Sequence, residues 1–266
     1  MPTYALCVEY DGSCFYGWQR QTSLKSVQGT LEDSLKIILA KNPHTSLFVA
    51  GRTDTGVHSL GMICHFKTDF PIPNLYKLLH SLNSLSAEGV TVRRATEVPD
   101  DFHARFSCTS REYVYQIYYS KYPCVHYEKH ALWIKQRVDW ERVKAELPYL
   151  LGEKDFRSLT KKNSMKGKRA IREIQTIELE RDTLVPEIFR IRIKANGFMH
   201  NMVRITVGTL LDIGKGRWES RSIASILGEE DRTKAGMTLP PHGLYFVRAY
   251  YQNYPQIQPL YEPQFP

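Results

Sequence analysis

The feature that most constrains this fold is a polar, glycine-flanked segment, Gly51–His58, which lies between two apolar runs. The runs Leu47–Ala50 and Leu60–Phe66 have the composition of β-strands, so the segment between them is predicted to be a connecting loop. Its glycines permit backbone angles that other residues resist, which allows a tight loop to present Arg52 and Asp54 side by side. On this pattern alone, Asp54 is more often a turn residue whose carboxylate accepts a backbone N–H than a catalytic group.

Strand and helix patterns alternate along the rest of the chain. Strands are indicated by alternating β-branched and aromatic residues, and helices by apolar residues spaced three or four apart. We expect strands at residues 4–10, 47–50, 60–66, 90–95, 113–118, 171–180, 188–195 and 244–250, and helices at 27–39, 75–85, 140–151 and 198–213. This order, with its antiparallel hairpin possibilities, predicts an α+β fold in which helices cover one side of a mixed sheet.

The chain is predicted to consist of two halves and a tail. A join near residue 107 separates an N-terminal half, residues 1–106, from a C-terminal half, residues 107–251. No flexible Gly/Ser linker occurs at the join, so we expect the halves to share a continuous sheet. Residues 252–266 contain four prolines and no apolar period, and we interpret them as an extended tail.

The charge balance is compatible with a phosphate-rich partner. The chain has 36 Lys and Arg against 28 Asp and Glu, a formal net charge of +8. Many soluble proteins carry such an excess without binding nucleic acid, so charge alone leaves both options open. Segment 161–169 has five basic residues and no acid, and it is either a solvated loop or an arm that grips phosphates. We favour the arm, in which Lys168 and Arg169 are the candidate contacts, because Arg172 follows it.

Motifs for cofactors, metals and membranes are missing from the sequence. The five cysteines form no C-x-x-C pair, which argues against a zinc ribbon or a disulfide framework and favours reduced thiols in the cytoplasm. The nine histidines are scattered, and there is no H-E-x-x-H, G-x-G-x-x-G or phosphate-binding loop. The N-terminus lacks a signal-peptide pattern, and no apolar run is long enough to span a bilayer. We therefore expect no metal, no cofactor and no membrane insertion.

Two more positions are candidates because of their spacing. Arg204 shares a partly apolar helix face with His200 and Leu211, and a buried guanidinium there needs a carboxylate or phosphate partner. The alternative is an arginine that extends along the helix to water. Tyr113 and Tyr115 lie on one face of a strand, where an aromatic side chain usually packs in the core. The alternative is that one of them stacks on an extruded nucleobase.

Taken in order, these segments resemble the TruA family of tRNA pseudouridine synthases over nearly the whole chain, apart from the tail. The loop GRTDTGVH at 51–58 is similar to that family's catalytic GRTDAGVH loop. Departures are Thr55 in place of Ala and Ser86 where the family often has Pro, both peripheral to the chemistry. The other matching stretches are Tyr10–Gly12, Phe15–Gln21, Val27–Gln28, Leu82–Asn83, Phe102–Phe106, Arg111–Tyr115, Phe198–Arg204 and Leu239–Leu244.

The resemblance implies the pseudouridine synthase fold, with two similar α+β halves around a central basic cleft, and the isomerisation of uridine to pseudouridine in tRNA. It assigns the catalytic aspartate to Asp54, the base-stacking tyrosine to Tyr113 and the aspartate-pairing arginine to Arg204. It also implies a homodimer, and the anticodon stem-loop at positions 38 to 40 as substrate. The residues expected to hold the RNA while the target base is extruded are Arg20, Arg52, Phe102, His103, Arg105, Lys168 and Arg169.

Two reaction routes and three other functions remain open. Ionised Asp54 acts either as a nucleophile at the sugar or as the base that removes a sugar proton to give a glycal. Arg204 would keep Asp54 charged, and Tyr113 would stack on the uracil. A non-catalytic RNA-binding protein would need the basic surface but not Asp54. An enzyme that only cuts the glycosidic bond would release free uracil, and a synthase of the same fold would act at another RNA position.

Overall fold

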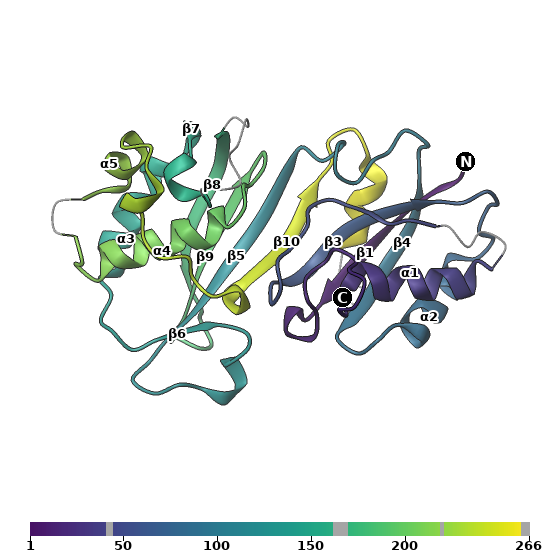
Figure 1. Cartoon of the computed structure of the whole chain (residues 1–266), viewed down its shortest axis with the longest axis horizontal. Coiled ribbons are helices and arrows are strands. Elements are labelled where there is room, and N and C mark those ends of the chain that lie inside the picture. Colours follow the sequence, from purple (N-terminus) through teal and green to yellow (C-terminus); the bar gives the residue numbers. More distant parts are fainter. Residues whose placement is uncertain (41–44, 162–169, 219–220, 262–266) are drawn as a thin grey trace. The chain divides into compact units, whose positions relative to one another are not determined.

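The structure is a computed structural model that describes residues 1–40, 45–161, 170–218 and 221–261 (Figure 1). Contacts divide the chain into two compact units, residues 1–110 with 246–266, and residues 111–245. Each unit contains strands and helices, which confirms the predicted α+β class. The expected join near residue 107 lies close to this division, whereas residues 246–251, expected in the C-terminal half, cluster with the first unit. The shared sheet and the central basic cleft concern the relation between the units and stay predictions.

The central strand of the first unit is β1 (Thr3–Tyr10). It pairs antiparallel with β3 (His58–Lys67) on one side and with β4 (Val90–Val98) on the other. β10 (Leu244–Tyr250) follows β3 in the strand order, and the short β2 (Phe48–Val49) also pairs with β3. Seven of the eight β1 residues are buried. A strand that is apolar along almost its whole length requires cover on both faces, and the unit provides it.

One layer of that cover consists of α1 (Val27–Ile38) and α2 (Leu75–Leu85), which contact each other. Both helices begin after a residue whose side chain accepts a backbone N–H of the first turn. Asn74 accepts from Lys77, and Ser26 accepts from Gly29. The buried leucines are four residues apart in each helix, Leu31 and Leu35 in α1 and Leu78 and Leu82 in α2, so the periodicity correctly predicted both helices.

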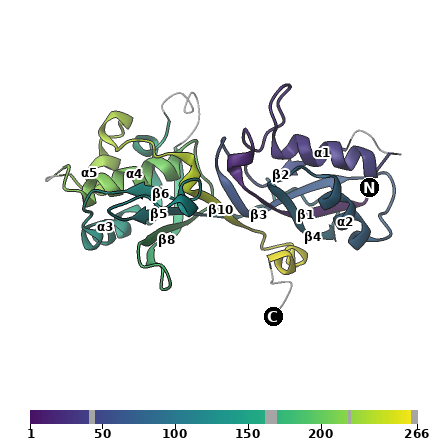
Figure 2. The ribbon, with the colours of Figure 1, turned by 90° about the horizontal axis from the view of Figure 1, so that it is seen from below.

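The C-terminal segment supplies the other layer, which corrects the expectation of an extended tail. Residues Pro255–Tyr261 form a 3-10 helix, η8, that contacts β1 and β4. Figure 2 shows η8 on the opposite side of these strands from α1. Ile257 and Leu260 are 2% and 4% exposed, so the segment is anchored by apolar burial. The prolines misled the prediction because a 3-10 turn tolerates them and two apolar residues suffice to dock it.

The second unit contains the strand order β5-β9-β8-β7. β5 (Ser110–Tyr119), β9 (Ile188–Ala195), β8 (Ile171–Arg181) and β7 (Gly152–Asp155) pair antiparallel, while β6 (Leu132–Ile134) runs parallel to β5. β9 alternates apolar buried residues with half-exposed basic ones, which is the pattern of a sheet with one covered face. β6 and β7 were not predicted, because three or four residues are too few to show a period.

Helices α3 (Trp140–Glu146), α4 (Met202–Gly214) and α5 (Ile223–Gly228) belong to the second unit (Figure 1). Twelve of the thirteen α4 residues are buried, so α4 is the core helix of this unit. It begins at Met202 and not at residue 198 as expected, because Asn201 adopts a left-handed conformation with φ of 62°. In the described ranges no helix has the length and apolar character needed to cross a membrane.

The docking of η8 gives a stability prediction. Leu260→Ala removes a buried side chain from the sheet face, so we expect the free energy of unfolding to fall by about 2 kcal/mol or more. The control is Gln256→Ala, because Gln256 is exposed in the same 3-10 helix. Urea unfolding of the full chain measures both variants. Equal stability of the two would show that the segment is not anchored by Leu260.

Candidate active site

The Asp54 loop connects β2 to β3 in the first unit. Its side chains divide into two sets, because Arg52 and Asp54 are exposed whereas Thr53 and Val57 are buried. The Val57 N–H donates to the Asp54 carbonyl over 3.2 Å and closes a four-residue turn. Gly56 occupies the third position of that turn with φ of 80°, a conformation that requires glycine. The turn therefore holds the backbone of the exposed Asp54, and the segment is the connecting loop that the sequence pattern predicted.

A second loop, between β1 and α1, packs directly against this backbone. Gly17 has φ of 86°, and a Cβ added there would lie 2.7 Å from the Thr53 carbonyl oxygen. A Cβ on Gly12 would likewise collide with the Val57 carbonyl. The Trp18 N–H donates to the Thr53 carbonyl over 3.1 Å. Glycines at these two positions thus permit a backbone-to-backbone contact that fixes the Asp54 loop.

Buried side chains complete this support. The Tyr10 hydroxyl lies 2.8 Å from Thr53 Oγ1, and Tyr10 is 3% exposed. A hydrogen bond in the buried, low-dielectric interior constrains the loop more strongly than one at the surface. The Trp18 ring lies 6.0 Å from the Tyr10 ring and is fully buried. The residue that precedes Asp54 is therefore held through its backbone and its side chain.

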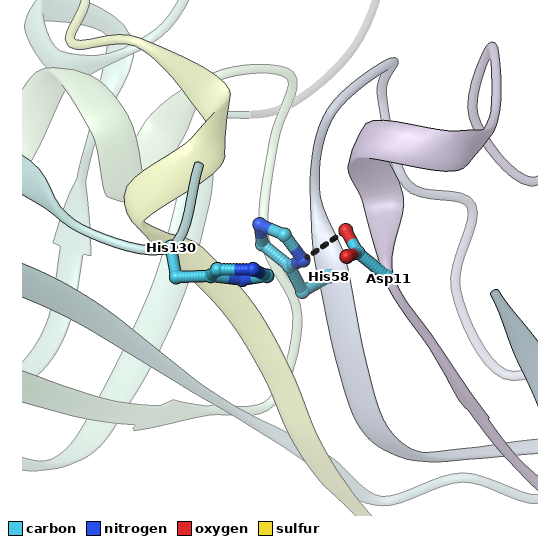
Figure 3. Close-up of side chains that lie close together, drawn as sticks. All are labelled: Asp11, His58 and His130. Atoms are coloured by element: carbon cyan, nitrogen blue, oxygen red, sulfur yellow. Dashed lines mark ion pairs between the residues drawn. The ribbon is translucent and has the colours of Figure 1, made fainter. Parts of the chain in front are cut away.

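His58 fastens the far end of the loop. Its imidazole is buried, and Nδ1 lies 3.1 Å from the Gly12 N–H nitrogen and 3.2 Å from Asp11 Oδ1 (Figure 3). One nitrogen cannot accept from Gly12 and donate to Asp11 at the same time, so which bond forms depends on whether Nδ1 carries a hydrogen. Either bond ties the start of β3 to the turn after β1. His130, which is also labelled there, belongs to the second unit.

Arg20 is engaged with α1. Its guanidinium donates to Asp33 over 2.8 Å and to Glu32 over 3.4 Å, and also to the Gly29 carbonyl. The hydrogen bond to Asp33 raises the pKa of Arg20 above its usual value. A phosphate would have to replace two carboxylates here, so Arg20 is placed less favourably for RNA than the exposed Arg52.

Phe102, His103 and Arg105 form part of a tight loop in the first unit. Phe102 is 1% exposed and packs against Tyr251, so it is a core residue of this unit. His103 Nδ1 accepts the N–H groups of Arg105 and Phe106 over 3.1 and 3.3 Å. Desolvation lowers the pKa of His103, and Arg105 is exposed.

A buried histidine lies beneath that loop. His65 Nδ1 accepts the Ala104 N–H over 3.1 Å, and its ring stacks on Phe48 with the centroids 5.2 Å apart. His65 is 1% exposed, and burial is the main cause that lowers its pKa to about 4, with the neighbouring His103 adding to the effect. The imidazole is therefore neutral around pH 7.

In the second unit, two tyrosines of β5 share one face of the strand. Tyr115 is fully buried and its hydroxyl donates to the Pro240 carbonyl over 2.8 Å, while burial raises its pKa well above the usual range. Tyr113 is 8% exposed and contacts Phe198 edge to face at 5.0 Å. The predicted packing role therefore describes Tyr115 fully, and Tyr113 is also buried but less completely.

Arg204 lies in the first turn of α4. Its Nε donates to the Leu239 carbonyl over 2.6 Å, and Nη1 donates to Asn201 Oδ1 over 3.0 Å. Both bonds lie within the second unit, and together they fix the plane of the guanidinium. Asn201 is thus both the residue that starts the helix and a partner of its arginine. Its left-handed conformation aims the side chain, and sequence spacing contained no signal for it.

The basic segment starts beside this helix. The Lys161 N–H donates to the His200 carbonyl over 3.2 Å. The candidate contacts Lys168 and Arg169 lie outside the described residues. The other predicted site residues divide between the two units, with Asp54 in the first and Tyr113 and Arg204 in the second.

The residue patterns did not single out the residues that support the site, although each of them lies in a stretch that resembles the family. They act through backbone atoms or buried contacts, so their chemistry does not appear in a sequence as charge or nucleophilicity. The missed supporting residues are Tyr10, Gly12, Gly17, Trp18, Asn201, Leu239 and Pro240.

Known proteins resemble this chain along both units. A family profile described as tRNA pseudouridine synthase matches residues 147–252, which include Arg204 but neither Asp54 nor Tyr113. A Leptospira biflexa protein named tRNA pseudouridine synthase A is 65% identical over 266 residues, 100% of each chain. Proteins of the same name from Leptospira interrogans and Caldicellulosiruptor bescii are 46% and 38% identical over 200 and 251 residues. These matches cover 75% and 94% of this chain, and 97% and 100% of the relatives.

The contact between the two loops can be tested with a matched pair of glycines. Gly17 and Gly152 both have positive φ, but a Cβ at Gly152 would meet nothing within 4 Å. We expect Gly152→Ala to cost about 1–2 kcal/mol of unfolding free energy from conformation alone. Gly17→Ala adds a collision with the Thr53 carbonyl and is expected to cost at least about 1 kcal/mol more. Equal losses in urea unfolding would contradict the close contact.

Burial of neutral His65 makes stability depend on pH. The unfolded state, with an ordinary histidine pKa near 6.5, binds more protons than the folded state, in which the pKa is about 4. The contribution of His65 to the free energy of unfolding is therefore fully present above about pH 6.5. It declines as the pH falls toward 4, by up to about 3 kcal/mol. His65→Gln should flatten urea unfolding against pH in this window. His80→Gln, at an exposed position of α2, should leave the pH dependence unchanged.

Proposed function

The chain belongs to the tRNA pseudouridine synthase family, and on that premise we propose that it isomerises uridine to pseudouridine in the tRNA anticodon stem-loop, at positions 38 to 40, with Asp54 as the catalytic carboxylate. The activity class follows from 65% identity over the full chain to a tRNA pseudouridine synthase A. One structural observation carries the assignment of Asp54. It is an exposed acid on a loop whose backbone is fixed by Gly12, Gly17 and buried Thr53.

The reaction is an isomerisation, so its atoms balance without water or an oxidant. The N1–C1′ bond breaks, the uracil turns, C5 bonds to C1′, and the C5 proton leaves while N1 gains one. In one route an Asp54 oxygen attacks C1′ and is later displaced by C5. In the other, Asp54 removes a sugar proton to give a glycal. Both routes need an ionised carboxylate held in place, and the loop provides the positioning.

We propose that Arg204 pairs with Asp54 in the working enzyme. The units carry these two residues separately, so a shared site would need both of them. The support from the second unit is that Arg204 is pre-oriented by the Leu239 carbonyl and the Asn201 side chain. An oriented guanidinium favours the charged form of a carboxylate and binds it in a defined plane.

Tyr113 is proposed to stack on the extruded uracil. Its neighbour Tyr115 is fully buried with its hydroxyl bonded to Pro240, whereas Tyr113 keeps 8% of its surface exposed. Tyr113 is in edge-to-face contact with Phe198, with the ring centroids 5.0 Å apart. A ring fixed in this way loses little freedom when a base stacks on it.

The RNA backbone is proposed to bind basic residues of both units. Arg52 and Arg105 are exposed, and Lys161, the first residue of the basic segment, donates its N–H to the His200 carbonyl just before α4. Arg20 would contribute only after exchanging its carboxylate partners for a phosphate. We further propose a homodimer in the cytoplasm, where the five free cysteines would stay reduced.

The proposal is tested by tritium release from tRNA labelled at C5 of uridine. Asp54→Asn should lower the rate at least about a thousandfold while tRNA binding persists, because the carboxylate is the reacting group. Asp69→Asn is the matched control, since Asp69 is an exposed acid of the same unit, and it should release tritium at the wild-type rate.

Mapping the product separates the remaining alternatives. Carbodiimide-dependent reverse-transcription stops at positions 38 to 40 support the proposed substrate, and a stop elsewhere makes the chain a synthase for another RNA position. Free uracil in the products would indicate an enzyme that only cuts the glycosidic bond. Binding of tRNA without tritium release would indicate a non-catalytic RNA-binding protein.

A further inference from the structure

Three aromatic rings form a continuous surface ladder in the first unit. Phe48 lies 5.3 Å from His103, and His103 lies 4.3 Å from Phe106, measured between ring centroids. Phe48 and Phe106 are 47% and 76% exposed. We call Phe48, His103 and Phe106 the stacking platform. Single exposed apolar side chains are common on protein surfaces, but a contiguous group of them usually marks a binding site.

The stacking platform is rigid. His103 Nδ1 accepts the N–H groups of Arg105 and Phe106, while Ser107 Oγ accepts the His103 N–H over 3.0 Å. The Ser107 N–H donates in return to the His103 carbonyl over 2.9 Å. These bonds close the loop on itself, so the exposed Phe106 ring is presented on a backbone that is already ordered. Preorganisation of this kind lowers the entropic cost of binding.

Buried rings support the platform from below. His65 lies 4.8 Å from His103 and stacks on Phe48, and it is 1% exposed. Phe102 packs edge-on against His65 and also contacts Tyr254. The exposed rings therefore cannot fold inward, because the space behind them is filled.

Charge beside the platform indicates which partner fits. The Arg105 guanidinium lies 5.6 Å from the centroid of the Phe106 ring. Arg52 is exposed four residues after Phe48, and the chain carries a net charge of +8. Flat exposed rings with an arginine at their side match an unpaired nucleobase and its phosphate, which proteins commonly bind by stacking and ion pairing.

We propose that the stacking platform binds an unpaired nucleobase of the RNA substrate, a few nucleotides from the uridine that reacts. Phe48 precedes Asp54 by six residues, so their Cα atoms lie at most about 22 Å apart. The platform would hold a neighbouring base out of its stack while Asp54 acts on the target. That the RNA is the substrate tRNA rests on the proposed function. That a base stacks here rests only on the arrangement of the three rings.

Binding of two fluorescently labelled RNAs tests the proposal, a hairpin with the anticodon stem-loop sequence and a blunt duplex without unpaired bases. Phe106→Ala should weaken hairpin binding about tenfold and leave duplex binding unchanged, because one base stack is lost. Phe106→Trp should bind the hairpin like the wild type. Tyr76→Ala removes a ring that is 77% exposed on α2 and should change neither affinity. Unchanged hairpin affinity in Phe106→Ala, or an equal loss on the duplex, would overturn the proposal.

Salt dependence separates the ring from the charge. Arg105→Gln should reduce the slope of log K against log salt by about 0.7 for one lost single-strand phosphate contact. Phe106→Ala should lower affinity without altering that slope. If Phe106→Ala instead changed the oligomeric mass measured by sedimentation and left hairpin affinity intact, the platform would be a contact between protein chains and the proposal would be wrong.

These binding assays are independent of catalysis. If the chain binds the hairpin through Phe106 but releases no tritium, the stacking platform is supported and the proposed isomerase function is contradicted. If the chain releases tritium and Phe106→Ala binds the hairpin like the wild type, the isomerase function is supported and the stacking platform is contradicted.

Discussion

The close contact between two backbones in the first unit is the constraint on which the site depends. The β1–α1 loop reaches the Asp54 loop only because residues 12 and 17 have no Cβ, and Trp18 then bonds the Thr53 carbonyl. Tyr10 reinforces the same point from the strand side. An exposed carboxylate is otherwise free to move, and its catalytic value depends on being held in one place. The backbone at Asp54 is thus held by residues that contact the loop's main chain and Thr53.

The second unit uses a different device for the same purpose. Arg204 is oriented by a carbonyl and by an asparagine whose left-handed backbone also starts α4, so the helix terminus and the guanidinium are set together. Tyr115, which lies on the same strand face as Tyr113, donates its hydroxyl to the Pro240 carbonyl. Each unit therefore prepares its own half of the proposed chemistry internally. In both, a main-chain carbonyl does the positioning, which makes the arrangement insensitive to many surface substitutions.

Much of this architecture could be predicted from the sequence, and the exceptions have physical reasons. The long strands and the helices α1, α2 and α4 carry clear periods, and the glycine-flanked segment at 51–58 correctly indicated a loop that exposes Arg52 and Asp54. β6, β7 and α5 are too short to show a period, and the docking of η8 depends on two apolar residues among prolines. Phe102 was expected near the RNA but is buried, because its neighbours and not its type decide burial.

The central claim is that Asp54 and Arg204 act as one catalytic pair. The most direct test is a double-mutant cycle in single-turnover isomerisation of tRNA, with the conservative variants Asp54→Glu and Arg204→Lys, which are expected to retain measurable rates. The account predicts that the double variant loses much less than the product of the two single losses, because the second change disturbs an interaction that is already broken. Losses that multiply would show that the two residues act independently, and would contradict the account.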